Sequence, residues 1–290
     1  MVFYDESNAA VLAHELEGLS RPLLVGGGLG LYLKQRQLEE SDETATLIAG
    51  ELWPPNRATH DMDLFLPTEI IVSAQEMGAI RTALERLGYT PVVRHFQFEK
   101  QTSLGPVKID LLTGGVPTGQ LDKVKINPPR IRPAGGDGLH AYLTQEAIAI
   151  ELEPVLHRLR GRRSDGTDSE LDVWIPNSFT YLVMKLHAFR DRMDDKQKGY
   201  AAHHALDCLR IVAMLTKHEH DFVRAQVVRN GSAPAVRSAR EVVDTAFADS
   251  HAPGVIRLKS ALRDSGAATS DAAVDEFVAV LHELFARASH

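Results

Sequence analysis

The sequence predicts an α+β protein, with a mixed α/β domain over residues 1–175 and a helical domain over residues 176–290. Two observations support this division. Short apolar runs with strand-like patterns, bounded by Gly and Pro, occur up to Ile175, whereas beyond Pro176 the apolar residues recur at helical spacing. The content of 44% hydrophobic and 24% charged residues is typical of a globular protein. The chain is long enough for two ordinary domains.

The first domain is expected to open with a helix, a strand and a second helix. Residues 9–19 place apolar side chains on one helical face, and residues 21–25 form a short apolar run that predicts a buried strand. Three glycines follow, and the second helix is predicted to begin at Leu29. A further helix is predicted at residues 38–51, within an insertion that ends at Pro54-Pro55.

The rest of the first domain is predicted to contain one long helix and several strands. Residues 68–87 have helical spacing, and Gly88 lies where the residue after a helix adopts a left-handed conformation. The Pro- and Gly-rich residues 116–138 predict a long connection. The predicted strands are residues 61–66, 89–99, 107–112, 147–160 and 170–175, of which the last two would form a pair.

Helices account for the predicted second domain. Asn177 or Ser178 supplies the side-chain oxygen expected at the N-cap of the first helix. Cys208, the single cysteine, excludes an internal disulfide and is expected to be a small buried residue. His203 and His204 lack the spacing of a zinc site and are expected to be structural. The predicted helices are residues 179–192, 200–215, 221–228, 234–247 and 271–288.

The net charge of −7 argues against a surface that attracts nucleic acid as a whole, so any RNA partner would need a local basic patch. The strongest basic cluster, Arg158, Arg160, Arg162 and Arg163, is either a charged hairpin tip or a contact for RNA phosphates. The chain shows neither an N-terminal signal pattern nor an apolar run of about 20 residues that could span a membrane, so a cytoplasmic location is expected.

Asp61 and Asp63 form the most informative motif. Side chains alternate along a strand, so both carboxylates are expected on one face while Met62 and Leu64 point to a core. Two adjacent carboxylates repel each other unless a cation lies between them, and oxygen ligands suit Mg²⁺. Asp110, in a second strand-like run, would complete a site for two Mg²⁺ ions and in-line phosphoryl transfer.

Gly26, Gly27 and Gly28 provide the second half of this argument. A strand, a glycine turn and a helix N-terminus present free backbone N–H groups to an anion, so this segment is a candidate phosphate cradle. It lacks the spacing of a dinucleotide-binding fingerprint, and the Gly-Lys-Ser/Thr of a P-loop does not follow. The sequence therefore offers a phosphate cradle and a metal-binding carboxylate pair near each other.

In these segments the chain resembles the nucleotidyltransferase superfamily of the DNA polymerase β type, whose pattern is a hydrophobic residue, two small residues, Asp-x-Asp/Glu and a later carboxylate. Within it, the chain is most similar to the AbiEii-type nucleotidyltransferases, many of which are toxins of type IV toxin–antitoxin systems. The resemblance covers about residues 22–212. The segments that carry it are Leu24-Val25-Gly26-Gly27-Gly28-Leu29, Arg57 to Leu64, Lys108-Ile109-Asp110, Lys185 to Arg192, Lys198, and His204-Ala205-Leu206-Asp207.

The resemblance implies a mixed-sheet nucleotidyltransferase domain that moves an NMP from an NTP to an acceptor hydroxyl. It implies a tRNA end as one acceptor and a cognate antitoxin protein as a partner. Metal ligation falls to Asp61, Asp63 and Asp110, while Lys185 would hold the triphosphate and Asp207 would orient Lys185. The residues that would bind the nucleotide are Gly26, Gly27, Gly28, Thr59, Lys185 and Arg192.

Two other functions stay open. Residues 35–56 form a long insertion where the spacer of the family is short, and Gly199 follows Lys198 where the family carries a Lys-Asp pair. These departures suit a nucleotide-binding module without transfer activity. The acidic stretch Glu39 to Glu43 would instead suit a cationic small-molecule acceptor, such as an antibiotic.

Overall fold

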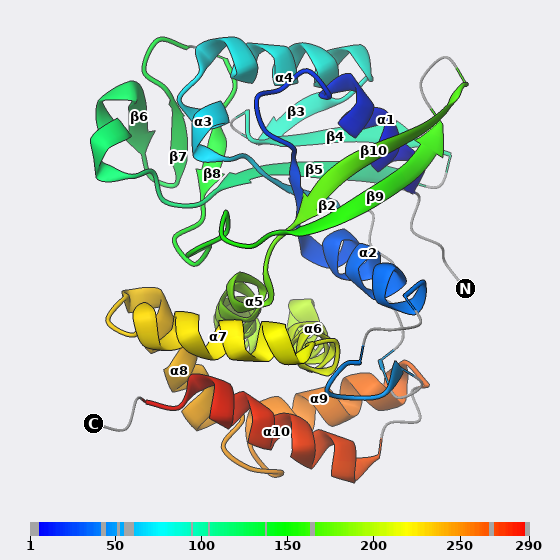
Figure 1. Cartoon of the computed structure of the whole chain (residues 1–290), viewed down its shortest axis with the longest axis vertical. Coiled ribbons are helices and arrows are strands. Elements are labelled where there is room, and N and C mark those ends of the chain that lie inside the picture. Colours follow the sequence, from blue (N-terminus) through cyan, green and yellow to red (C-terminus); the bar gives the residue numbers. More distant parts are fainter. Residues whose placement is uncertain are drawn as a thin grey trace. The chain divides into compact units, whose positions relative to one another are not determined.

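The computed structural model describes residues 6–41, 45–50, 53–54, 61–93, 95–103, 105–136, 138–162, 166–266 and 270–287. The chain divides into two compact units. Unit 1 comprises residues 1–34 and 57–176, and unit 2 comprises residues 35–56 and 177–290. Unit 1 carries a mixed β-sheet and unit 2 is helical (Figure 1), so the predicted α+β class is confirmed.

Unit 1 is built on a sheet with the strand order β6-β7-β8-β5-β2-β1-β10-β9, to which the β3–β4 hairpin is joined through β5. β5 runs parallel to both β2 and β8, whereas β6–β7 and β9–β10 are antiparallel hairpins. β4 and β8 pair with successive parts of one edge of β5, because β2 occupies the other edge. The strands are β1 Leu24–Val25, β2 Asp61–Phe65, β3 Thr90–Val93, β4 Gln97–Thr102, β5 Gly105–Thr113, β6 Val124–Asn127, β7 Arg130–Pro133, β8 Ala141–Leu143, β9 Val155–Arg162 and β10 Asp168–Ile175.

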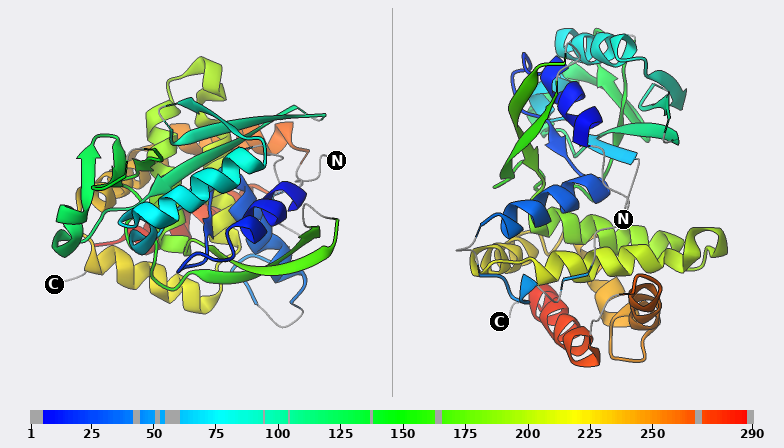
Figure 2. Two further views of the ribbon diagram at one scale, coloured as in Figure 1. Left: turned by 90° about the horizontal axis from the view of Figure 1, so that it is seen from above. Right: turned by 90° about the vertical axis from the view of Figure 1, so that its right-hand side faces the viewer.

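One face of the central strands contributes to the core of unit 1. Met62 and Leu64 of β2 and Ile109 and Leu111 of β5 are buried, as the alternating pattern of their strands requires. Helix α1 packs on β9 and β10 and touches α4, and both views in Figure 2 show these two helices side by side. The helices that begin in this unit are α1 Glu6–Glu15, α2 Gly27–Glu39, α3 Thr68–Ile71, α4 Ala74–Arg86 and the 3₁₀ helix η2 Thr118–Lys123.

The helix predicted at residues 68–87 is divided into α3 and α4. The break occurs because Ser73 has an extended conformation and its side chain accepts a hydrogen bond from the backbone N–H of Glu76, which starts a new helix. Gly88 has a φ of +82°, so its predicted left-handed conformation after the helix is confirmed.

The prediction of a long connection at residues 116–138 is wrong. This segment contains η2 and the β6–β7 hairpin, whose turn is formed by Pro128 and Pro129. Each strand is only four residues long, so the surrounding Pro and Gly obscured its alternation of polar and apolar residues. Strand β8, which pairs with β7, was not predicted either.

Three other predictions need correction. Residues 89–99 form not one strand but β3 and the start of β4, which are separated by a turn in which His95 has a φ of 61°. The strand predicted at residues 147–160 begins only at Val155, because residues 147–153 form turns. The described part of residues 38–51 beyond α2 contains no α-helix: Thr46 forms an isolated β-bridge with Thr216, and Gly50 is in a 3₁₀ turn.

Among its described residues, unit 2 contains the predicted helices and one further α-helix. Asn177 rather than Ser178 is the N-cap of α5, since its side chain accepts a hydrogen bond from Thr180 N at 2.9 Å. Phe247 joins the core by contacting the rings of Phe189 and Phe277. The helices are α5 Ser178–Arg192, α6 Ala202–Ala213, α7 Lys217–Arg229, α8 Pro234–Ala246, the unpredicted α9 Pro253–Asp264 and α10 Asp271–Phe285, with the 3₁₀ helix η3 Lys196–Ala201.

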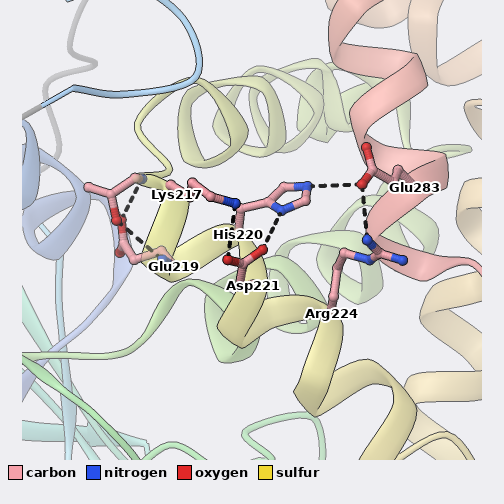
Figure 3. A network of polar contacts seen from close by, with 7 residues as sticks. Lys217, Glu219, His220, Asp221, Arg224 and Glu283 are labelled. Carbon is pink, nitrogen blue, oxygen red and sulfur yellow. Dashed lines mark hydrogen bonds and ion pairs between the residues drawn. The ribbon is translucent and has the colours of Figure 1, made fainter.

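Helix α7 is fixed at both its start and its exposed face. Glu219 completes a capping box, in which it exchanges hydrogen bonds with the N-cap residue Thr216. Further along, His220 lies between the carboxylates of Asp221 and Glu283, each 3.5 Å away, and Arg224 also contacts Glu283 of α10 (Figure 3). These contacts join α7 to α10 within unit 2.

Candidate functional site

The sheet of unit 1 brings Asp63 and Asp110 together. β2 and β5 are parallel neighbours in which Asp63 is the register partner of Asp110, and Asp61 is the partner of Lys108. Residues in register on adjacent strands point to the same face, so these four side chains leave the face opposite the buried Met62. Asp61 is exposed and Asp63 is half-buried, which confirms the predicted alternation along β2.

Asp110 lies in a partly buried environment beside an amide side chain. Gln97 of β4, its register partner on the other edge of β5, donates a hydrogen bond from Nε2 to Asp110 Oδ1 at 2.7 Å. Burial raises the pKa of the Asp110 carboxyl above its usual range, and the Asp61 carboxylate raises it further, against the opposing effects of Gln97 and Lys108. The ionised form is therefore held at a free-energy cost that a bound cation or proton would relieve.

The three glycines lie directly beside Asp63. Gly26 N donates a hydrogen bond to the main-chain oxygen of Asp63 at 2.7 Å. Gly27 has a φ of +61°, and a Cβ atom there would lie 2.5 Å from Asp63 Oδ2. Only glycine allows the backbone to approach the carboxylate this closely in that conformation. Gly28 follows at half-buried depth in the first turn of α2.

Helix α2 begins earlier than predicted. The glycines were expected to form a turn ahead of a helix starting at Leu29, but Gly27 is already the first helical residue. The α2 N-terminus, with its positive dipole end, consequently lies next to the Asp63 carboxylate instead of one turn away from it. This arrangement suits a phosphate that contacts both the helix N-terminus and a cation on the carboxylates.

The donor set fits Mg²⁺ by its chemistry. Mg²⁺ takes oxygen ligands, usually one or two carboxylates together with waters and substrate phosphates, and Asp61, Asp63 and Asp110 would provide the protein ligands. Among the residues that the structure describes, no group of three or more His, Cys, Asp or Glu side chains is already gathered closely enough to hold a metal ion. Thr59, the other predicted ligand-binding residue near β2, lies outside the described residues.

Lys185 and Asp207 form a buried ion pair in unit 2. Lys185 Nζ lies 2.7 Å from Asp207 Oδ2, so the predicted contact between them is present. Asp207 also contacts Arg210, with 3.0 Å between Oδ1 and the guanidinium NH1. Asp207 and Arg210 are each 1% exposed, so one buried carboxylate is shared by two cations. Their mutual attraction is strong only because water is excluded.

Arg192 and His204 lie beside this cluster. Arg192 NH1 contacts His204 Nε2, and because a guanidinium can only donate, His204 must be neutral with its proton on Nδ1. Burial, together with the smaller effect of the nearby Lys185 charge, lowers the pKa of His204 to about 2. His204 is buried, which agrees with its predicted structural role, and Cys208 is also buried as expected.

Two residues that matter here were not predicted as part of the site. Gln97 is the register partner of Asp110 because β4 and β5 form an antiparallel hairpin that also pairs Thr102 with Gly105, a pairing that was not predicted. Arg210 was not predicted as a buried partner of Asp207, although a position three residues along the same helix is a usual spacing for a contact.

Comparisons of the chain with protein-family models, with curated proteins and with solved structures found no match. In the part of the chain that the structure describes, no helix is both long enough and apolar enough to cross a bilayer.

Proposed function

We propose that the protein is a Mg²⁺-dependent nucleotidyltransferase that moves an NMP from an NTP to an acceptor hydroxyl. The observation that supports this most is the position of Asp63, which is the register partner of Asp110 and lies against Gly27 at the start of α2. Carboxylates and a helix N-terminus in contact suit a triphosphate bound through a divalent cation. The sequence resemblance to AbiEii-type nucleotidyltransferases points the same way.

In the proposed reaction the acceptor oxygen bonds to the α-phosphorus, the bond from the α-phosphorus to the bridging oxygen breaks, and pyrophosphate leaves. Mg²⁺ would supply the positive charge that screens the phosphates and acidifies the attacking hydroxyl. Asp61 and Asp63 orient the triphosphate side of the site, and the backbone N–H groups of Gly27 and Gly28 donate to phosphate oxygens. Asp110, with its raised pKa, accepts the proton of the hydroxyl. Lys185 belongs to unit 2, and only the sequence resemblance gives it the role of neutralising the charge that develops on the leaving pyrophosphate.

By the same resemblance, we propose that a tRNA end is the acceptor, that the reaction takes place in the cytoplasm and arrests growth, and that an antitoxin protein opposes it. The test is to incubate the protein with Mg²⁺, total tRNA and each α-labelled NTP in turn. Label should enter RNA with the unchanged protein and not with Asp61→Asn/Asp63→Asn. Asp122→Asn, at an exposed carboxylate of the same unit, is the matched control and should keep full activity. Transfer that survives in the double variant would refute the proposal.

A nucleotide-binding module without transfer activity is the second candidate. It is favoured by one observation, that the described carboxylates do not converge on a metal site. Calorimetry would distinguish the two functions. Heat of NTP binding, together with no transfer of label to tRNA or to an aminoglycoside-type antibiotic, would favour the binding module.

A further inference from the structure

The β6–β7 hairpin forms a basic hollow in unit 1. Lys125 and Asn127 of β6 are the register partners of Arg132 and Arg130 of β7, so these four side chains share one face of the hairpin. They line a hollow of about 390 Å³ together with Ile131 and His140. No carboxylate is among the described residues that line it, although the whole chain has a net charge of −7.

Arg130 is the residue of this hollow that most requires a ligand. Its Nε atom is buried and has no hydrogen-bond partner in the described part of the protein. A buried guanidinium N–H without a partner is costly, and an anion entering the hollow would satisfy it. Lys125 is exposed and forms no ion pair with a described residue, so it is available to the same anion.

Arg158 and Arg160 of the β9–β10 hairpin, which the sequence offered as contacts for RNA phosphates, already pair with carboxylates. Arg158 Nε lies 3.3 Å from Asp172, and Arg160 Nε lies 3.1 Å from Glu170, both across the β9–β10 hairpin. Each of these arginines already faces a carboxylate in register with it. For Arg158 and Arg160 the structure therefore supports the charged-hairpin interpretation, whereas Arg163 and the side chain of Arg162 lie outside the part of the chain that it describes.

The basic hollow shares a sheet face with the candidate active site. Arg130 is in register with Tyr142 of β8, Tyr142 with Leu112 of β5, and Leu112 lies two residues beyond Asp110 on the same side of the strand. With neighbouring strands about 4.8 Å apart, Arg130 is about 10 Å from β5. Tyr142 lies between them, is 37% exposed, and packs edge-on against Phe96 with ring centroids 5.5 Å apart.

We propose that this face binds a single-stranded nucleic-acid end, with Lys125, Arg130 and Arg132 on its phosphates and Tyr142 stacked on a base. This inference rests on the proposed function, for which it identifies the surface that holds the acceptor strand. Cations that follow the phosphates and an aromatic ring for the bases are the two elements of single-strand binding. The order of Arg130, Tyr142 and Asp110 across the sheet leads the bound end toward the carboxylates.

The test measures binding separately from transfer. Fluorescence anisotropy with a labelled 12-nucleotide RNA, full-length protein and Mg²⁺, without NTP, gives Kd and its dependence on salt. Arg130→Gln/Arg132→Gln should raise Kd at least about tenfold and reduce the salt slope by roughly two. Arg158→Gln/Arg160→Gln removes the same charge from a hairpin of the same unit and should leave both values unchanged. Tyr142→Ala should raise Kd about fivefold with an unchanged salt slope.

Several outcomes would overturn the inference. One is an equal loss of binding in both double variants, and another is no loss in the β6–β7 variant. A third such outcome is that Arg130→Gln/Arg132→Gln weakens the binding of inorganic triphosphate to the protein but leaves RNA binding unchanged. That result would assign the hollow to a nucleotide. If the double variant does not fold, Lys125→Gln at the exposed end of the hollow must still lower the salt slope by about one. Asp61→Asn/Asp63→Asn must keep RNA binding while losing transfer, so a failure of transfer alone counts against the proposed function and not against this site.

Discussion

Asp63 on β2 and Asp110 on β5 are register partners in a parallel strand pair, so residues 47 positions apart in the chain present carboxylates to one face of the sheet. The Asp63 carboxylate lies against Gly27, and the Asp110 carboxylate is held by Gln97 from the opposite edge of β5. Each of the two carboxylates is thus held by a different neighbouring residue. The register of β2 and β5, and not a flexible loop, positions these carboxylates, which would favour the precise geometry that the proposed transfer requires.

Asp110→Asn should stabilise the protein while abolishing transfer. The raised pKa means that the ionised carboxyl lowers stability above its folded-state pKa, and that this effect is relieved as the pH falls and the folded state takes up a proton first. The gain should be present at pH 7 and should shrink toward pH 4. Urea unfolding at both pH values measures it. Asp122→Asn should show no such gain, and a destabilised Asp110→Asn at pH 7 would contradict the argument.

Gly27→Ala should cost more free energy of unfolding than Gly88→Ala. Both glycines have a positive φ, but a Cβ at Gly88 meets nothing within 4 Å, whereas at Gly27 it meets Asp63 Oδ2. Backbone strain alone costs about 1–2 kcal/mol, so Gly88→Ala should fall in that range and Gly27→Ala should exceed it. Chemical denaturation of the two variants gives the comparison. Equal costs would mean that the Asp63 side chain moves away freely.

Asp207→Asn should be strongly destabilising. The substitution leaves Lys185 and Arg210 buried without a counter-charge, at a cost of about 3–5 kcal/mol. Asp221→Asn is the matched control, because Asp221 pairs with Lys217 at 3.3 Å in an exposed position (Figure 3), where such pairs often contribute nothing measurable. Thermal unfolding of both variants measures the two losses of stability. A small loss for Asp207→Asn would argue that water reaches Lys185 and Arg210.

His204 should remain neutral across the physiological range and should make the protein sensitive to acid. Its folded pKa of about 2 lies far below that of an unfolded histidine, so its contribution is fully present above pH 6.5 and is lost as the pH falls. Between pH 6.5 and pH 5 this loss amounts to about 2 kcal/mol. His204→Gln should remove that part of the pH dependence of unfolding. His251→Gln, at a side chain that is 93% exposed, should not change it.

Local sequence signals predicted the parts of this structure that local physics decides. Alternation predicted that Asp61 and Asp63 share a face, and the side-chain oxygens of Asn177 and Ser178 predicted a helix start close to where α5 begins. Gly88 takes its expected left-handed conformation because few other residues tolerate it. Short strands such as β6 and β7 were not predicted, because four residues give too short an alternation of polar and apolar side chains to be recognised beside Pro and Gly.

The sequence by itself determined which residue types stand at strand ends, helix starts and buried faces, because those choices depend on neighbours a few positions away. Only the tertiary structure decided which of them meet. Sheet register made Asp110 the partner of Asp63. Carboxylates on the neighbouring strand pair with Arg158 and Arg160. The unpredicted β6–β7 hairpin brought Lys125, Arg130 and Arg132 to the same face as Asp110. Pairings between distant segments depend on how whole strands align, and no local pattern records that alignment.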